Sequence, residues 1–241
     1  MLRLTRFRRP TPAATPALLV ALAPLVYFLP ATLGSLVLCP DDGVLFNLPL
    51  RVAAARVTLG GDAPLWNPYL FGGMPLLASA QGGLLYPLNW LYLLLPARAA
   101  TNLVMLASYA LAGLGAFFYA RRAGADSRGA LTTALVWQFC GFAVAQIGHT
   151  NIVHTAALLP WLLWSIEAYA TTGRRTRGAL VAVFVALQAF AGHQQTFAYS
   201  LLLACAYAAC MAAAGGRTTR RAYLVSLLLV LVGLALAAVQ L

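Results

Sequence analysis

Two adjacent carboxylates stand just beyond the first apolar run of this chain. Asp41 and Asp42 open a Gly- and Pro-rich stretch, residues 39–100, which lies between two hydrophobic segments. Neighbouring carboxylates repel each other, which favours a proton on one of them and suits general-base chemistry near neutral pH. A simpler role is also open, because an Asp that precedes an amphipathic segment can cap a helix. The two roles are compatible, so both residues are candidate catalytic groups.

The histidines form the second set of candidate functional residues. His149 and Asn151 lie in Gly148-His149-Thr150-Asn151, with His154 one helical turn further on. His193 and Gln195 lie in Ala191-Gly192-His193-Gln194-Gln195. Ionisable groups near hydrocarbon are costly, and they are functional candidates by default. Any one histidine alone could be a capping or interfacial residue; three on one face beside two carboxylates favour a binding site.

The composition predicts a membrane protein. Hydrophobic residues make up 62% of the 241 residues, charged residues 9%, and the mean hydropathy is +0.81. The net charge is +11, but the basic residues sit in short clusters between apolar runs, which disfavours nucleic acid and favours anionic lipid headgroups. The four cysteines show no CxxC spacing, so neither a disulfide framework nor a zinc site is predicted.

Apolar runs of roughly 20 residues, the length needed to cross a bilayer, predict an all-α polytopic protein with a single transmembrane domain over 1–241. We expect about seven spans, at 17–38, 101–120, 130–147, 152–170, 178–194, 196–214 and 222–241. Segment 84–95 is short and interrupted by Pro87 and Asn89, so we expect it to be interfacial or re-entrant. The last run reaches Leu241, and we therefore expect a C-terminal remainder beyond it.

The arginines predict the orientation. If all seven runs cross, thirteen of the sixteen arginines fall on one side, and only Arg51, Arg56 and Arg98 fall on the other. The positive-inside rule then places the N-terminus in the cytoplasm, behind an uncleaved signal-anchor helix, and the loop 39–100 outside.

Two further expectations concern single elements. Leu48, Val52, Ala55 and Leu59 have helical spacing, which predicts a helix on the outer membrane surface with Arg51 and Arg56 off its apolar stripe. Glu167 lies late in the fourth predicted span, and pairing with a cytoplasmic arginine is its simplest role.

Several motifs resemble bacterial YfhO-type membrane proteins. They are Asp42 with Pro49 seven residues later, Pro64-Leu65-Trp66-Asn67-Pro68-Tyr69-Leu70-Phe71-Gly72-Gly73-Met74-Pro75, Tyr86-Pro87-Leu88-Asn89, Gly148-His149 with Asn151 and His154, Leu159-Pro160-Trp161, and Ala191-Gly192-His193-Gln194-Gln195. The resemblance covers nearly the whole chain after the first predicted helix. Gln194 is a departure, since the related pattern more often reads Gly-His-Pro-Gln.

That family is similar to the GT-C superfamily of membrane glycosyltransferases, which take sugar from a polyprenyl-phosphate carrier. The resemblance implies that Asp42 is the general base, with Asp41 beside it, and that the protein acts on a cell-envelope polymer or lipid acceptor at the outer face of the bacterial cytoplasmic membrane. It also implies substrate-binding roles for His149 and His193. The three outer arginines, Arg51, Arg56 and Arg98, are candidates to bind the phosphate leaving group, because it needs positive charge.

The sequence leaves the cofactor and two alternative functions open. Some GT-C relatives use a divalent cation, to which Asp41 and Asp42 could contribute, although two adjacent carboxylates are a thin ligand set. A transporter or flippase for lipid-linked sugars is one alternative, and a non-catalytic envelope assembly factor is another. The chain contains no Walker loop, dinucleotide fingerprint or HExxH helix, which disfavours a nucleotide-driven enzyme.

Overall fold

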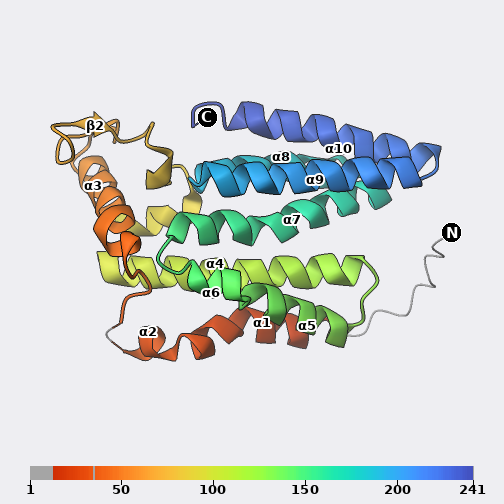
Figure 1. Cartoon of the computed structure of the whole chain (residues 1–241), viewed down its shortest axis with the longest axis horizontal. Coiled ribbons are helices and arrows are strands. Elements are labelled where there is room, and N and C mark those ends of the chain that lie inside the picture. Colours follow the sequence, from red (N-terminus) through yellow and green to blue (C-terminus); the bar gives the residue numbers. More distant parts are fainter. Residues whose placement is uncertain (1–12, 35, 241) are drawn as a thin grey trace.

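Long helices lie side by side (Figure 1). Residues 36–96, which precede the helix α4 (Ala97–Arg122), fold over one end of these helices, and we refer to them as the gathered segment. The computed structural model describes residues 13–34 and 36–240. The longer helices are α1 (Ala14–Tyr27), α4 (Ala97–Arg122), α5 (Ser127–Gln138), α7 (Thr150–Thr172), α8 (Arg175–Phe190), α9 (Gln194–Ala214) and α10 (Arg217–Leu236). The described residues thus form an all-α protein apart from one two-stranded hairpin.

The core is formed by two groups of helices that share α7. Helix α4 packs against α7, α5 and α1, while α10 packs against α8 and α9. Small residues permit the second contact: Ala204, Ala208 and Ala212 form one buried face of α9. At Gly233 of α10, an added Cβ would lie 2.5 Å from the Cβ of Val185, so glycine is needed for the approach of α10 to α8.

In the described part of the chain, three helices, α4, α9 and α10, are long and apolar enough to cross a membrane. The expected spans at 17–38 and 130–147 are each broken in two. The first divides into α1 and α2 (Leu29–Leu33) at Phe28, because Pro30 lacks the N–H that a continuous helix requires. The second divides into α5 and α6 (Gly141–Ala145), where Cys140 is extended and its sulfur accepts from the backbone of Ala143. Both breaks therefore follow local backbone chemistry rather than hydropathy.

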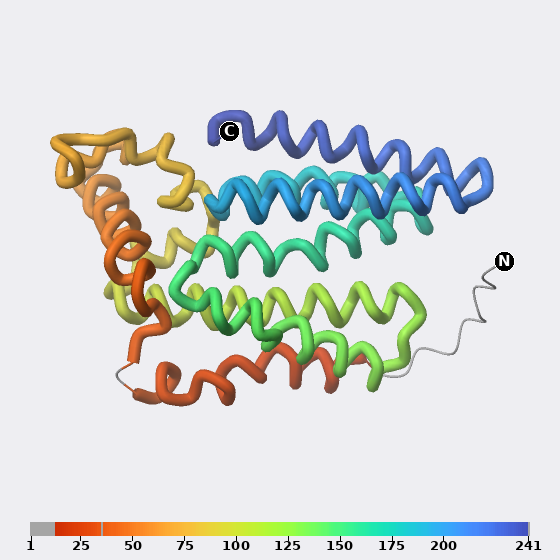
Figure 2. The backbone as a smooth tube through the Cα atoms, viewed as in Figure 1, coloured from red at the N-terminus to blue at the C-terminus, as the bar shows by residue number. Residues whose placement is uncertain are grey.

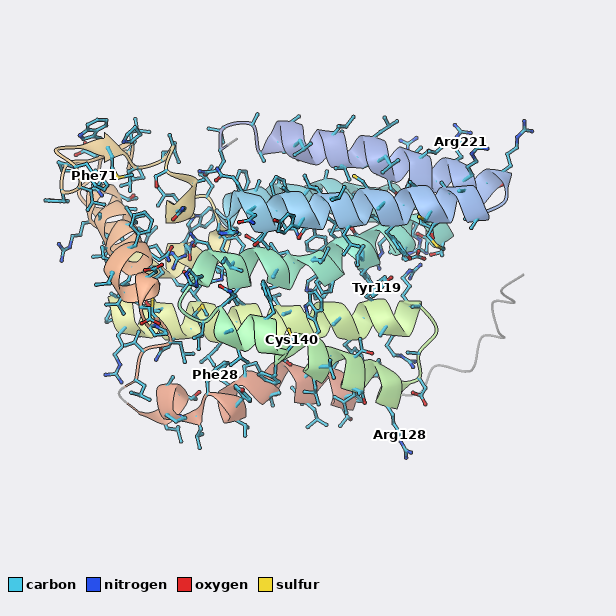
Figure 3. All side chains as sticks on the ribbon, in the orientation of Figure 1. Phe28, Phe71, Tyr119, Arg128, Cys140 and Arg221 are labelled. Carbon is cyan, nitrogen blue, oxygen red and sulfur yellow. The ribbon has the colours of Figure 1, made fainter. Side chains whose placement is uncertain are left out.

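The described arginine clusters lie at the end of the helices away from the gathered segment. Arg128 and Arg221 are labelled there, and Phe71 of the gathered segment is labelled at the opposite end (Figure 3). The α4–α5, α7–α8 and α9–α10 connections, with their flanking arginines, all lie at this basic end (Figure 1).

The gathered segment contains a π-helical turn, η1 (Gly43–Asn47), that continues into α3 (Leu48–Leu59). The strands β1 (Trp66–Asn67) and β2 (Met74–Pro75) and the 3-10 turns η2 (Ala80–Gly82) and η3 (Pro87–Leu93) follow. Helix α3 runs across the direction of the long helices (Figure 2). Segment 84–95, which we expected to be interfacial or re-entrant, contains η3, packed on α3 and α4.

The buried face of α3 differs from the predicted stripe. Leu50, Arg51, Ala54 and Ala55 are buried, whereas Leu59 is 68% exposed. The apolar spacing predicted the helix correctly, and Ala55 of the predicted stripe is buried, but the buried face is rotated to include Arg51. Two of the Arg51 guanidinium nitrogens are hydrogen-bonded there.

Candidate functional site

The two aspartates lie where the chain enters η1. Asp41 has φ of 51°, and its backbone carbonyl accepts hydrogen bonds from the N–H groups of Val44 and Leu45. Asp42 takes the N-cap position of η1, but its carboxylate caps no backbone N–H. Both side chains are exposed. The capping alternative therefore does not describe Asp42, whose carboxylate is directed elsewhere.

The partner of Asp42 is His149, at the N-cap position of α7. His149 Nε2 lies 3.4 Å from Asp42 Oδ2, the one ion pair within 4 Å among residues 13–34 and 36–240. Two glycines allow this approach. A Cβ on Gly43 would lie 2.8 Å from the carbonyl oxygen of Gly148, and a Cβ on Gly148 would lie 2.9 Å from that of Pro40. The pair is solvent-accessible, so it contributes little to stability but is open to a substrate.

A buried arginine braces the two helices that carry this pair. Arg51 of α3 is only 2% exposed, and its Nη1 donates to Thr150 Oγ1 at 2.6 Å. Its Nη2 donates to Asn151 Oδ1, and Asn151 Nδ2 donates to the carbonyl oxygen of Gln81 at 2.5 Å. The guanidinium thus joins α3 to the first two residues of α7, which follow His149 in the chain, and Asn151 extends the link to η2.

This burial separates Arg51 from the other arginines that were predicted to bind substrate. Arg51 and Asn151 are both buried and engaged with each other, so they position the site rather than face solvent. Arg56, on the same helix, is exposed and available to an anionic group. Arg98 is used differently: its Nη2 donates to the carbonyl oxygen of Gly34, at the end of α2.

His193 lies in the turn between α8 and α9, and it caps α9. Its Nδ1 accepts from the N–H of Thr196 at 3.2 Å and lies 2.8 Å from Thr196 Oγ1. Burial lowers the pKa of His193, and the charge of His149 lowers it further. The two histidines are therefore close enough to interact electrostatically. Gln195, also predicted to bind substrate, is exposed and donates to Tyr199 Oη at 2.8 Å.

His154 does not face the same surface as the other two histidines. It is fully buried, and its Nδ1 lies 2.8 Å from Ser108 Oγ of α4. Ser108 Oγ also lies within hydrogen-bond distance of the carbonyl oxygen of Val104, one turn earlier on α4. The ring of Tyr86 stacks on His154, with centroids 5.2 Å apart. Sequence reasoning missed Ser108 and Tyr86; a serine within an apolar run was the available signal for Ser108.

An apolar groove of about 280 Å³ lies beside this cluster. It is lined by side chains of η3 and its flank, α4, α7 and α8, namely Tyr86, Pro87, Leu88, Leu111, Leu158, Trp161, Phe184 and Leu187. Trp161 is fixed there, because its Nε1 donates to the carbonyl oxygen of Leu111 and its ring stacks on Phe184. Tyr86 lies at the junction of the groove and the buried polar cluster, and burial raises its pKa.

The residues near Asp42 do not fit a divalent cation site. In the described part of the chain, no group of three or more His, Cys, Asp or Glu side chains could hold a metal ion. Asp42 and His149 supply two donors at this position.

Glu167 lies toward the basic end of α7 and belongs to a separate polar cluster. Its carboxylate accepts a hydrogen bond from Tyr223 Oη at 2.5 Å and another from Tyr207 Oη. Among the described residues no arginine lies within 4 Å of the Glu167 carboxylate, although Glu167 interacts electrostatically with Arg122. The two tyrosines, from α9 and α10, both donate to Glu167 Oε1. Arg122 instead donates to Thr171 Oγ1, one turn beyond.

Comparison with known proteins found no matching family model, no matching curated protein and no matching solved structure.

Proposed function

We propose that this protein is a membrane glycosyltransferase that moves a sugar from a polyprenyl-phosphate carrier to a cell-envelope acceptor, with Asp42 as the general base. The observation that carries the proposal is the Asp42–His149 pair. It is an accessible carboxylate–imidazole contact, held in place by a buried arginine. The resemblance to YfhO-type proteins agrees with this assignment.

The proposed topology places the Asp42–His149 pair relative to the membrane. We infer that α7, α8 and the broken pairs α1–α2 and α5–α6 also cross the bilayer, in addition to α4, α9 and α10. The basic end of the helices then faces the cytoplasm of a bacterium, and Asp42 faces outward. The apolar groove opens along the same helices, where hydrocarbon would surround it. A polyprenyl chain is a ligand of the chemistry that such a lining accepts.

The proposed reaction is a displacement at the anomeric carbon. The acceptor hydroxyl attacks this carbon while Asp42 takes the hydroxyl proton, and the bond to the phosphate oxygen breaks. His149 holds the Asp42 carboxylate and can pass the proton to solvent. The exposed Arg56 and the imidazole of His193 are the candidates to receive the phosphate, which leaves with the electron pair of the broken bond.

Turnover by three aspartate variants tests the base. The full chain in lipid nanodiscs is assayed with a panel of polyprenyl-phosphate-linked hexoses and pentoses, following release of polyprenyl phosphate. General-base catalysis supplies about 10²- to 10⁴-fold, so Asp42→Asn should lose at least about 100-fold. The exposed Asp62→Asn is the matched control and should retain turnover, while Asp41→Asn should fall between the two. Wild-type turnover by Asp42→Asn, with Asp62→Asn equal to it, would remove Asp42 as the base.

A transporter of lipid-linked sugars is the second candidate, and His154 is the observation that favours it. An ionisable side chain buried between α4 and α7 suits a path through the helices better than a reaction at the surface. Translocation of a fluorescent lipid-linked sugar in proteoliposomes, without release of polyprenyl phosphate, would favour this function over transfer.

A further inference from the structure

Three aromatic side chains project from the β1–β2 hairpin and its loop. Trp66 is 54% exposed, Tyr69 77% and Phe71 91%, and we refer to these three residues as the aromatic tip. Exposing large aromatic surface to water is unfavourable, and clustered exposed apolar groups commonly mark interaction sites. The proposed reaction uses none of the three.

The backbone holds the aromatic tip outward. Leu76 is fully buried, and its N–H donates to the carbonyl oxygen of Leu65 at 2.7 Å, which anchors the base of the hairpin. The buried Asn67 accepts from the N–H of Tyr69 at 3.0 Å. Phe71 has φ of 53°, a left-handed conformation that is uncommon for a bulky residue.

Gly73 allows the Trp66 ring to pack directly on the backbone. Its φ is +123°, and an added Cβ would lie 2.5 Å from the six-membered part of the Trp66 ring. The indole therefore rests on the Gly73 backbone, while more than half of Trp66 stays open to solvent. Two other tryptophans, Trp90 and Trp161, donate their indole N–H to backbone carbonyls.

The hairpin stands beyond the ends of α8, α9 and α10, at the end of the molecule opposite the arginine clusters (Figures 1 and 3). Asp42 and α3 belong to the same gathered segment. In the proposed topology, the aromatic tip is on the outer side, beyond the ends of α8, α9 and α10 and at about the level where α4 begins (Figure 1). A role in water is thus favoured over insertion into hydrocarbon.

We infer that the aromatic tip binds a neutral glycan, whose sugar rings stack on the open faces of Trp66, Tyr69 and Phe71. Residues 63–79 contain no charged side chain, so the hairpin itself has no cation to pair with an anionic ligand. Within this range it also lacks the basic residues that accompany aromatic side chains at anionic membrane surfaces. Flat apolar faces beside hydroxyl and indole N–H groups match the alternating C–H and O–H surface of a sugar.

This inference rests on the proposed function in one respect: the glycan would be the acceptor, or the part of it next to the hydroxyl that reacts. The acceptor is then a neutral saccharide. Binding of this glycan to the aromatic tip requires neither the sugar donor nor proton transfer to Asp42. Glycan binding without any turnover would therefore reject the transferase and leave this inference standing.

The test is glycan binding by the full chain in nanodiscs. An array of neutral and acidic oligosaccharides is probed with wild type, Trp66→Ala and Phe71→Ala. The matched control is Leu94→Ala, which removes a 78%-exposed apolar side chain near the start of α4, away from the hairpin. We expect retention of neutral oligosaccharides, a loss of at least tenfold in apparent affinity in both aromatic variants, and a change of less than twofold in the control.

Three results would overturn the inference. The first is that the array retains no neutral glycan, or retains acidic ones better. The second is equal retention by wild type and both aromatic variants. The third is that the aromatic tip is covered by something else. Quenching of Trp66 fluorescence by brominated lipids, taken as wild type minus Trp66→Phe, would show the bilayer. A dimer that Phe71→Ala dissociates would show a second copy.

Discussion

Arg51 is the buried charged side chain next to the site. It makes two hydrogen bonds to α7 from a buried position, and hydrogen bonds to charged groups contribute about 1.5–3 kcal/mol each. Arg51→Met should therefore lower the free energy of unfolding by about 3 kcal/mol, because Thr150 and Asn151 lose their donor. Denaturation of the purified chain in mixed micelles measures this loss.

Arg56 provides the control for that measurement. It lies five residues further along the same helix and is exposed, so Arg56→Met should change stability by no more than about 0.5 kcal/mol. Equal losses in the two variants would contradict the bracing role of Arg51. The sequence predicted that both Arg51 and Arg56 lie off the apolar face of the helix. Helical spacing shows which residues are apolar, but not which polar residue is buried and hydrogen-bonded in the fold.

His193 should make the stability of the protein depend on pH. Its folded-state pKa is lowered, by burial first and by His149 second, so the unfolded chain binds a proton more readily. Stability is then fully present above the ordinary pKa of about 6.5 and falls as the pH drops below it. Protonation also removes the Nδ1 lone pair that caps α9.

Thermal unfolding between pH 7.5 and pH 5 measures the effect of His193. His193→Asn keeps a capping side chain but does not titrate in this range, so its unfolding temperature should fall less than that of wild type. Identical pH dependence in the two proteins would assign the titration elsewhere. A chain with both His149→Asn and His193→Asn separates the contribution of His193 from that of its neighbour His149.

At the scale of elements, the α8–α9 turn depends on its contact with η2. Gly192 has φ of +88°, and an added Cβ would lie 2.1 Å from the carbonyl oxygen of Ala80. Gly173, at the end of α7, also has a positive φ, but an added Cβ there would meet nothing within 4 Å. Gly173→Ala therefore incurs only the left-handed backbone cost of about 1–2 kcal/mol.

Gly192→Ala should be destabilising by about 2 kcal/mol more than Gly173→Ala, because a backbone oxygen cannot move aside as a flexible side chain can. Hydrogen exchange should show faster opening of 80–83 in this variant, and no such change for Gly173→Ala. Equal stabilities would mean that the turn and η2 separate at little cost.

Uninterrupted apolar helices were predicted from the sequence more accurately than helices broken by a local backbone feature. The helices at 101–120, 196–214 and 222–241 are predicted well, because hydropathy is uninterrupted and neighbouring polar groups lie at their ends. The breaks at Phe28 and Cys140 depend on a missing N–H and a local cap, which a hydropathy average does not register. Likewise, Ser108 and His154 are 46 residues apart, and only the packing of α4 on α7 reveals their contact.

At the scale of the molecule, charge asymmetry organises the proposed orientation. Nine arginines lie in or beside the turns at the basic end, namely Arg121, Arg122, Arg128, Arg174, Arg175, Arg177, Arg217, Arg220 and Arg221. The Asp42–His149 pair, the aromatic tip and η2 lie at the other end. If the helices cross a membrane, the positive-inside rule predicts that the basic turns face the cytoplasm and the Asp42–His149 pair faces outward.

Cysteine labelling in intact bacteria tests this orientation directly. In a background with the native cysteines replaced by Ala, Phe71→Cys is 91% exposed at the proposed outer end and should react with a membrane-impermeant maleimide. Arg128→Cys and Arg221→Cys, at the basic end (Figure 3), should react only after the membrane is permeabilised. This expectation rests on the positive-inside rule, because each arginine on the outer side of the membrane would oppose it. Labelling of Arg221→Cys in intact cells would invert the orientation, place Asp42 in the cytoplasm and remove the outer-face acceptor from the proposal.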